Sequence, residues 1–190
     1  MIIYVPKLWP TGKLAIAPKY ISGFYRGNLQ QSNYTIAEVL KRFSEGPTTG
    51  VFTDGSAQPN PGPGGWGYVY VINGEVIKAD HGHDPKTTNN RMELRGLIEA
   101  YKILPLDAEI NIFSDSNLCV QTLNSWAHNW EKRGWTKKGG EIANLELVKE
   151  LFALYKAHPK VKVQWIKAHN GWLWNEYADS LSTAWTRKQV

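Results

Sequence analysis

Four carboxylates in this sequence combine the residue type and the placement that metal-dependent chemistry requires. Asp54 and Asp115 each follow a short apolar run directly, while Glu93 falls in the first turn of a segment with helical periodicity and Asp179 one turn into another. Clustered carboxylates repel one another unless cations neutralise them, and Mg²⁺ is held by a few carboxylates together with phosphate oxygens. The set therefore suggests two-metal hydrolysis of a phosphodiester.

Each of these carboxylates taken alone also has an ordinary structural explanation. Asp54-Gly55 is compatible with a turn, Glu93 with a favourable interaction with a helix dipole, and Asp115-Ser116 with a helix N-cap. The chemistry therefore depends on a fold that brings the four together.

The elements expected around these residues begin with strands and continue with helices that alternate with strands. Asn73-Gly74 is a strong two-residue hairpin signal between the second and third strands. The order predicts an α/β domain with a mixed sheet and helices on its faces. Strands are expected at 51–53, 66–72, 75–81, 109–113 and 161–166, helices at 92–104, 117–125, 142–158 and 175–186, and loops at 58–65 and 84–90.

Composition excludes several classes of protein. Of the 190 residues only one is a cysteine, Cys119, which rules out an internal disulfide framework and a cysteine-rich zinc site. No apolar run approaches the roughly 18 residues of a membrane span, and the first ten residues do not resemble a secretory signal. We therefore expect a cytoplasmic protein, a monomer with no membrane partner.

The basic excess lies mostly in the first quarter of the chain. The net charge is +5, and residues 1–50 hold six basic and two acidic residues. Gly46, Pro47 and Gly50 mark a break there. We expect residues 1–50 to be a small N-terminal extension, with a short helix at 35–43, and residues 51–187 to be the main domain. An anionic partner such as nucleic acid and solubility alone both explain the charge.

Several separated motifs resemble the type 1 ribonuclease H family, over nearly the whole of residues 51–187. They occur in the family's order, which makes the resemblance specific. They are Thr53-Asp54-Gly55-Ser56-Ala57, the Asn60-Pro-Gly-Pro-Gly-Gly-Trp66-Gly67 run, Thr87-Thr-Asn-Asn-Arg-Met-Glu-Leu94, Ser114-Asp115-Ser116, and His169-x-Gly171 followed by Asn175-Glu176-x-x-Asp179.

The resemblance implies a ribonuclease H-like fold, a five-stranded mixed β-sheet flanked by α-helices, and cleavage of the RNA strand of RNA–DNA hybrids. It implies two Mg²⁺ ions, with Mn²⁺ as an alternative, bound by Asp54, Glu93, Asp115 and Asp179, with Asp54 as the bridging ligand. His169 matches a mobile-loop histidine that shuttles a proton or assists product release. An ordinary imidazole pKa of about 6.5 suits that task.

The resemblance also assigns substrate contacts to polar loop residues. Asn60, Asn90 and Asn117 match positions near the ribose or base edges of the RNA strand, and amides suit a 2′-hydroxyl because they both donate and accept. Thr88 matches a position near a DNA-strand phosphate, and Asn89 lies beside it. Turn chemistry explains each of these residues equally well.

Residues 126–138 resemble the basic protrusion of bacterial members, which we call the handle. The segment holds four basic residues and one acidic residue among its tryptophans. Interleaved aromatic and cationic side chains suit a nucleic-acid backbone. We expect Trp130 to be mostly buried and the cations to be exposed; the expected substrate contacts are Trp130, Lys132, Arg133, Lys137 and Lys138.

The loop around His169 departs from the family pattern. Ala168 precedes the histidine where the family often has glycine, and Trp172-Leu173-Trp174 fills a region that is usually small or polar. A bulky loop is either less mobile or packs on the substrate. The contribution of His169 to the rate is therefore the open point of the site.

Other classes of protein share parts of this pattern. They are a hybrid-binding protein without catalysis, an integrase-like enzyme and a ribonuclease H domain of a reverse transcriptase. The complete quartet disfavours the first, and the Thr-Asn-Asn-Arg-Met-Glu-Leu motif and the handle disfavour the second. The aromatics of residues 1–50 are compatible with either a hybrid-binding module or packing on the catalytic domain.

Overall fold

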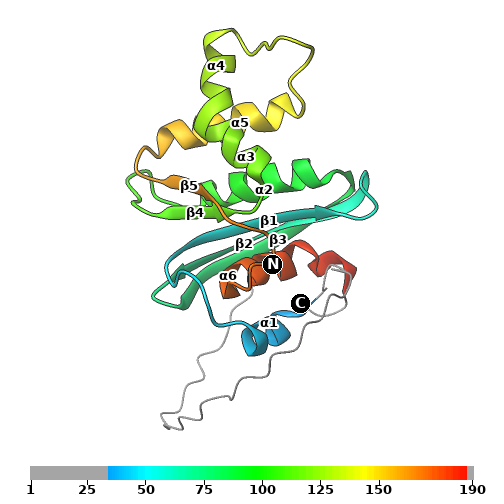
Figure 1. The fold of residues 1–190 in the computed structure, drawn as a ribbon, viewed down its shortest axis with the longest axis vertical. Helices are drawn as coiled ribbons and strands as arrows, with labels where there is room; N and C mark the ends of the chain where they lie inside the picture. Colours follow the sequence, from blue (N-terminus) through cyan, green and yellow to red (C-terminus); the bar gives the residue numbers. More distant parts are fainter. Residues whose placement is uncertain (1–33, 188–190) are drawn as a thin grey trace.

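The structure, a computed structural model, describes residues 34–187, which form a five-stranded sheet with helices on both faces (Figure 1). The strand order is β3-β2-β1-β4-β5. The central strand β1 pairs antiparallel with β2 and parallel with β4, so the predicted mixed sheet is confirmed. The strands are β1 (Gly50–Ala57), β2 (Gly62–Ile72), β3 (Glu75–Thr87), β4 (Asn111–Ser114) and β5 (Lys162–Trp165).

The helices form a layer on each face of the sheet (Figure 1). Helices α2 (Asn89–Lys102), α3 (Asn117–Gln121) and α5 (Leu145–Ala157) lie on one face, and α1 (Ile36–Arg42) and α6 (Leu173–Ser182) lie on the other. Helix α3 continues through a π-helical segment, η1 (Thr122–Trp126), into α4 (Ala127–Lys132), and a short 3₁₀-helix, η2 (Ala184–Thr186), follows α6.

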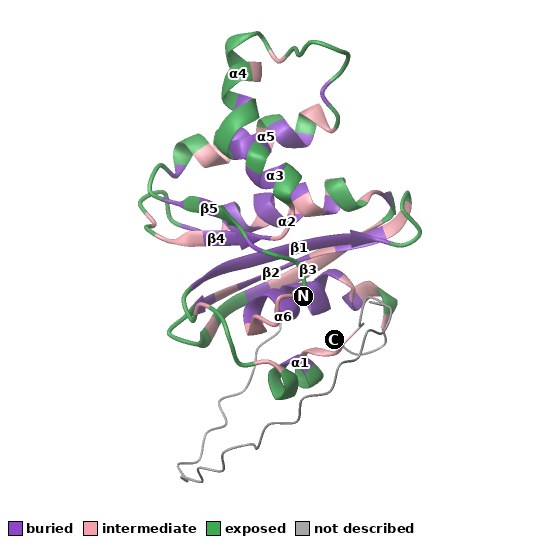
Figure 2. Cartoon of the chain, viewed as in Figure 1, coloured by how far each residue is buried: buried purple, intermediate pink, exposed green. Residues whose placement is uncertain are grey.

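Two apolar clusters hold these layers to the sheet, and Figure 2 shows buried residues along β1 and in the helices α2 and α6 that cover it. On one side, α2 buries Leu94, Leu97, Ile98 and Tyr101, which recur at the spacing of an amphipathic helix. On the other side, Tyr177 and Leu181 of α6 pack with residues of β1 and β2. Successive residues of β1 alternate between the two clusters, as a strand covered on both faces requires.

The hairpin of β2 and β3 is longer than the sequence predicts, because residues 62–65 and 82–87 also belong to its strands. Gly62 pairs with Thr87, so residues expected in two loops are part of the ladder. A Cβ on Gly65 would lie 2.4 Å from the carbonyl oxygen of Ser182, and one on Gly67 would lie 2.4 Å from Leu181 Cβ. The glycines thus allow α6 to approach β2 closely.

Several helix ends also differ from the predicted ones. Helix α2 begins at Asn89, because Thr88 caps it by accepting a hydrogen bond from the backbone N–H of Arg91, so Glu93 lies in its second turn and not its first. The predicted helix 117–125 extends to Lys132 through η1 and α4. Helix α5 begins at Leu145, after Asn144 in a left-handed conformation, and α6 begins two residues early, at Leu173.

The end of the N-terminal extension contacts the rest of the fold. The expected short helix is present as α1, with a capping box between Thr35 and Glu38. Val39 is fully buried, and Tyr34 and Phe43 pack against the cluster that holds α6. The other five aromatics of residues 1–50 lie outside the described residues. Among residues 34–187, no helix combines the length and apolarity needed to cross a membrane.

Candidate active site

Strand pairing places two of the predicted carboxylates side by side. Thr53 of β1 is in register with Ser114 of the parallel strand β4, so Asp54 and Asp115 are the next residues on neighbouring strands. Thr53 and Ser114 are both fully buried and fix the strands at this point. The two aspartates therefore owe their proximity to the sheet itself.

Gly55 brings the third carboxylate to the same place. Its backbone lies against the backbone of α2: a Cβ on Gly55 would lie 2.1 Å from the nitrogen of Glu93 and 2.2 Å from the carbonyl carbon of Met92. Only a residue without a side chain allows this approach. Carboxylate oxygens of Asp54, Glu93 and Asp115 consequently lie within 4.8 Å of one another.

Helix α6 supplies the fourth carboxylate on the other side of Asp54. Asp179 is largely buried in α6, and one turn later the Ser182 hydroxyl donates a 2.5 Å hydrogen bond to Asp54 Oδ2. An oxygen of Asp179 lies within 4.8 Å of ligand atoms of His169 and Glu176. The structure thus brings the predicted quartet together around Asp54.

Burial and mutual repulsion disfavour the charged forms of these carboxyls. Burial, and then the neighbouring charge of Asp54, raise the pKa of Asp115 to about 7 and that of Asp179 to about 8. The pKa of Glu93 is raised well above its ordinary value, by burial and by all three aspartates. Burial also raises the pKa of Asp54, although the Ser182 hydroxyl opposes the rise.

These residues fit divalent metal ions. Glu93 Oε2 is buried and has no hydrogen-bond partner among the described residues, although a buried polar atom normally has one. A cation bound between Asp54, Glu93 and Asp115 would pair that oxygen and relieve the repulsion among the three carboxylates. Oxygen ligands alone suit a hard ion such as Mg²⁺.

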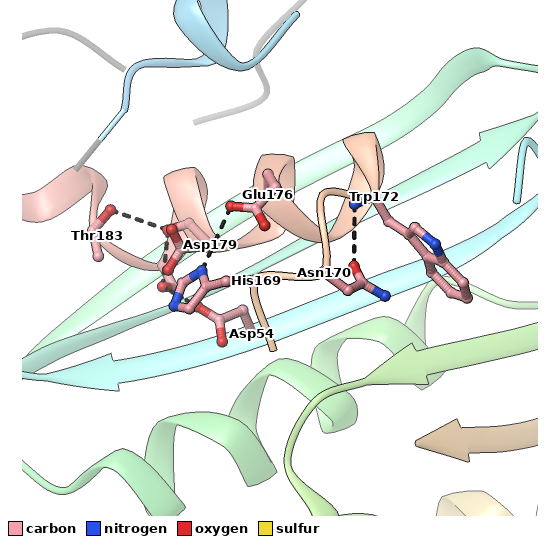
Figure 3. Close-up of polar contacts among 8 residues, drawn as sticks. Asp54, His169, Asn170, Trp172, Glu176, Asp179 and Thr183 are labelled. Carbon is pink, nitrogen blue, oxygen red and sulfur yellow. Dashed lines mark hydrogen bonds and ion pairs between the residues drawn. The ribbon is translucent and has the colours of Figure 1, made fainter. Parts of the chain in front are cut away.

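His169 lies in the loop before α6, next to the carboxylates. Figure 3 shows its ring beside Asp54 and Asp179, and His169 Nδ1 lies 3.6 Å from Glu176 Oε2. The Glu176 carboxylate raises the pKa of His169 to about 9, against the opposing effect of burial. The imidazole of the metal-free protein is therefore protonated near neutrality, in contrast to the ordinary value assumed from the sequence.

Sequence reasoning did not assign roles to three further residues of α6. Glu176 is almost fully buried and faces His169, the nearby amide of Asn175 lowers the pKa of Asp115, and Ser182 holds Asp54. Positions 175, 176, 179 and 182 share one side of a helix by their spacing. That periodicity, with polar residues on a face expected to be buried, was the available signal.

The polar loop residues lie around the start of α2. Asn60 Oδ1 accepts a hydrogen bond from the backbone N–H of Asn89 at 3.2 Å, and Asn89 Oδ1 accepts one from Ala57 at 2.6 Å. Thr88 is the N-cap of α2, and Asn90 is exposed in its first turn. Asn117, also exposed, begins α3 directly after Asp115 and Ser116. Asn89 and Thr88 therefore have structural roles, while Asn90 and Asn117 are free to reach a ligand.

The handle extends away from the sheet (Figure 1). Trp130 packs against the first apolar cluster with only a minor part of its surface exposed, as the sequence predicts, and its ring lies 6.0 Å from that of the exposed Trp126. The four basic side chains are exposed, as expected; they are Lys132, Arg133, Lys137 and Lys138.

Comparisons with known proteins agree with this site. The RNase H family model matches residues 47–186. A ribonuclease H of Campylobacter jejuni is 45% identical over 132 residues, which cover 70% of this chain and 86% of the relative.

Two solved structures are similar to this chain. LC9-RNase H1, described as a type 1 RNase H with the type 2 active-site motif, is 31% identical with a TM-score of 0.59, covering 74% of each chain. LC11-RNase H1, solved in complex with RNA/DNA hybrid, is 25% identical with a TM-score of 0.55, covering 70% of this chain and 93% of that one. With the family model matching most of its length and a relative at 45% identity, the chain belongs to the ribonuclease H family.

Proposed function

We propose that Asp54, Glu93, Asp115 and Asp179 carry the ribonuclease H activity of this chain, the hydrolysis of the RNA strand of RNA–DNA hybrids. The observation that supports this most strongly is the approach of three carboxylates to within 4.8 Å, together with a buried oxygen of Glu93 that has no hydrogen-bond partner among residues 34–187. A protein that only binds hybrids has no use for such a costly arrangement of like charges.

The quartet would hold two divalent ions, with Mg²⁺ as the natural ion and Mn²⁺ as a substitute. Asp54 is suited to bridge them, because it lies within 4.8 Å of Glu93 and Asp115 on one side and influences the pKa of Asp179 on the other. Ions bound there would activate a water and stabilise the leaving oxygen of the phosphodiester. The hydrogen bond from the Ser182 hydroxyl to Asp54 Oδ2 limits the rotation of this carboxylate and supports that role.

His169 is proposed to act as a proton donor beside the reacting phosphate. The Glu176 carboxylate lies 3.6 Å from His169 Nδ1 and favours the protonated imidazole. Nε2 of the ring is then the atom available to a substrate oxygen or phosphate. A positioned histidine of this kind contributes about 10²- to 10⁴-fold to a rate.

We propose that Asn60, Asn90 and Asn117 contact the RNA strand, that Thr88 and Asn89 lie near the DNA strand, and that the handle binds the hybrid through its cations and Trp130. The exposure of Asn90, Asn117 and the handle lysines supports this. A cytoplasmic monomer is part of the proposal, with residues 51–187 as the catalytic domain and residues 1–50 as an extension.

A cleavage assay on an RNA–DNA hybrid labelled on its RNA strand tests the activity. We expect cleavage with Mg²⁺, none with chelator, and a loss of at least about 10³-fold in Asp54→Asn, since that change removes the proposed bridging charge. Leu106→Ala, at an exposed position on the α2–β4 connection, is the control and should cleave normally. Equal cleavage by Asp54→Asn would refute the site assignment.

A further inference from the structure

Residues 34–46, which we call the strap, lie outside the residues matched by the family model, 47–186. They include α1 and run along α6 to the loop of residues 168–172, which carries His169. We infer that the strap positions this loop, with Gly46 and Trp172 as the contact through which it does so. The inference rests on the role proposed above for His169.

The strap is fixed to α6 along its length. Its helix buries Val39 completely, in the same cluster as Tyr177 and Leu181 of α6. The Ser180 hydroxyl donates a 2.7 Å hydrogen bond to the carbonyl of Tyr34 at the start of the strap. The strap is therefore packed on the helix that carries Glu176 and Asp179.

The end of the strap contacts the His169 loop through backbone and side chain. Glu45 forms a parallel bridge with Trp172, and the Leu173 N–H donates to the carbonyl of Glu45 at 2.8 Å. Gly46 follows with φ of 102°, and a Cβ placed on it would lie 2.7 Å from Trp172 Cγ. The indole therefore covers Gly46 so closely that no side chain fits between them.

The contact at Trp172 is three residues from His169, along a segment with little freedom. The side chain of Asn170 accepts a hydrogen bond from the backbone N–H of Trp172 at 3.1 Å (Figure 3), and His169 and Gly171 both have positive φ. The Trp172 ring meets Phe113 of β4 edge-on, with centroids 6.2 Å apart. Trp172 is thus held between the strap and the strand that leads to Asp115.

The bulk of Trp172 fills the space between Gly46 and Phe113. A small residue there would leave Gly46 and Phe113 uncovered and the loop free to move. Through Trp172 the strap would hold the loop at His169, whose left-handed backbone (φ 48°) needs support from its surroundings.

Gly46→Ala in the full-length chain tests the inference, because the added methyl displaces Trp172. We expect kcat for hybrid cleavage to fall about 10-fold with KM within 2-fold of the parent value, since a small misplacement of a catalytic group reduces rate more than binding. Gly74→Ala is the matched control: Gly74 also has positive φ, but within the described part of the chain its Cβ would meet no atom within 4 Å. It should retain the parent kcat.

A double-mutant cycle separates positioning of His169 from general damage. In a His169→Ala background, Gly46→Ala should reduce kcat by less than 2-fold, because its target has been removed. Trp172→Leu, which keeps the glycine and removes the ring, should reproduce both results and provides the test should Gly46→Ala fail to fold. If Gly46→Ala or Trp172→Leu lowered kcat by the same factor with and without His169→Ala, the effects would be independent, and the inference would be overturned.

The single variants distinguish this inference from the proposed function. If His169→Ala cleaves at the parent rate, the role of His169 fails, and the inference fails with it. If His169→Ala slows cleavage while Gly46→Ala and Trp172→Leu do not, only the strap inference is refuted.

Discussion

The carboxylate site and the handle carry charges of opposite sign, and they differ in how deeply the charges are buried and in how many elements supply them. Each carboxylate of the site comes from a different element, is at least partly buried, and lies within a few ångströms of another. The cations of the handle lie on one short helix and the turn after it, and all are exposed. Short-range chemistry thus coincides with tight packing, whereas long-range attraction of a polyanion needs only charge on a surface.

The two regions also differ in how they are attached to the rest of the fold. Two left-handed residues, Gly134 and Trp135, turn the chain after α4, and the indole of Trp135 meets Phe152 of α5 edge-on at 5.9 Å. A salt bridge of 2.6 Å between Lys156 and Glu131 adds a contact at the surface. A few side chains hold the handle, whereas the backbones of β1 and α2 are in direct contact at the site.

The largest difference between the carboxylate site and the handle should appear in the loss of stability when a glycine of each region is replaced by alanine. Gly55→Ala should lower the free energy of unfolding by at least about 3 kcal/mol, because its Cβ would overlap the backbone of α2. Gly134→Ala meets open space and should cost at most about 1–2 kcal/mol through its positive φ. Urea denaturation measures both, and similar losses would contradict the contrast.

The next effect concerns pH and metal at the site. Raised pKa values of about 7 for Asp115 and about 8 for Asp179 mean that the folded protein binds protons more tightly than the unfolded one. The stability that these two carboxyls contribute to the metal-free protein should therefore be fully present below about pH 4 and be lost as the pH rises to 8. The pKa of about 9 for His169 adds a loss in the same direction, from about pH 6.5 to 9.

Mg²⁺ should reverse this loss, because it binds the deprotonated carboxylates. Thermal melting with and without Mg²⁺ should show an increase in Tm of several degrees at pH 8 and little at pH 5. Asp115→Asn should reduce both the pH dependence and the metal effect. An equal Mg²⁺ effect at the two pH values would argue against binding at these groups.

A smaller effect is expected from the charges of the handle. Lys137→Glu combined with Lys138→Glu should raise KM for the hybrid about 5- to 10-fold with kcat nearly unchanged, because binding is lost equally in ground and transition states. The dependence of KM on salt should weaken as well. Lys78→Glu on β3, also exposed, is the control for net charge. An unchanged KM at several salt concentrations would exclude a binding role for these lysines.

The smallest effect is expected at the surface salt bridge of the handle. Glu131→Gln should change the free energy of unfolding by less than about 1 kcal/mol, because both partners are exposed. Melting curves of Glu131→Gln, Lys156→Met and the double variant would measure the coupling. A coupling well above that value would show that the handle is held more rigidly than its packing indicates.

Periodicity and motif spacing predicted most of this fold and the quartet. Helix α2 and the β2–β3 hairpin were predictable because their apolar residues and Asn73-Gly74 act locally. Residues 62–65 were read as part of a loop, because their place in a strand depends on α6, a distant element. The spacing of α6 indicates that Glu176 shares a face with Asp179, but its contact with His169 depends on the fold of a loop that spacing does not place.

The π-helical segment η1, between α3 and α4, has a consequence for how the handle is directed. A helix turns by about 100° for each residue, so one residue more or fewer in this segment changes the direction in which everything beyond it points. Deleting one residue from Thr122–Trp126 would leave the spacing of the handle's basic residues unchanged. It would nevertheless rotate the handle to a different direction relative to the sheet. The number of residues in η1 thus determines the direction in which the basic surface of the handle points. An insertion or deletion in η1 would redirect that surface without changing its side chains.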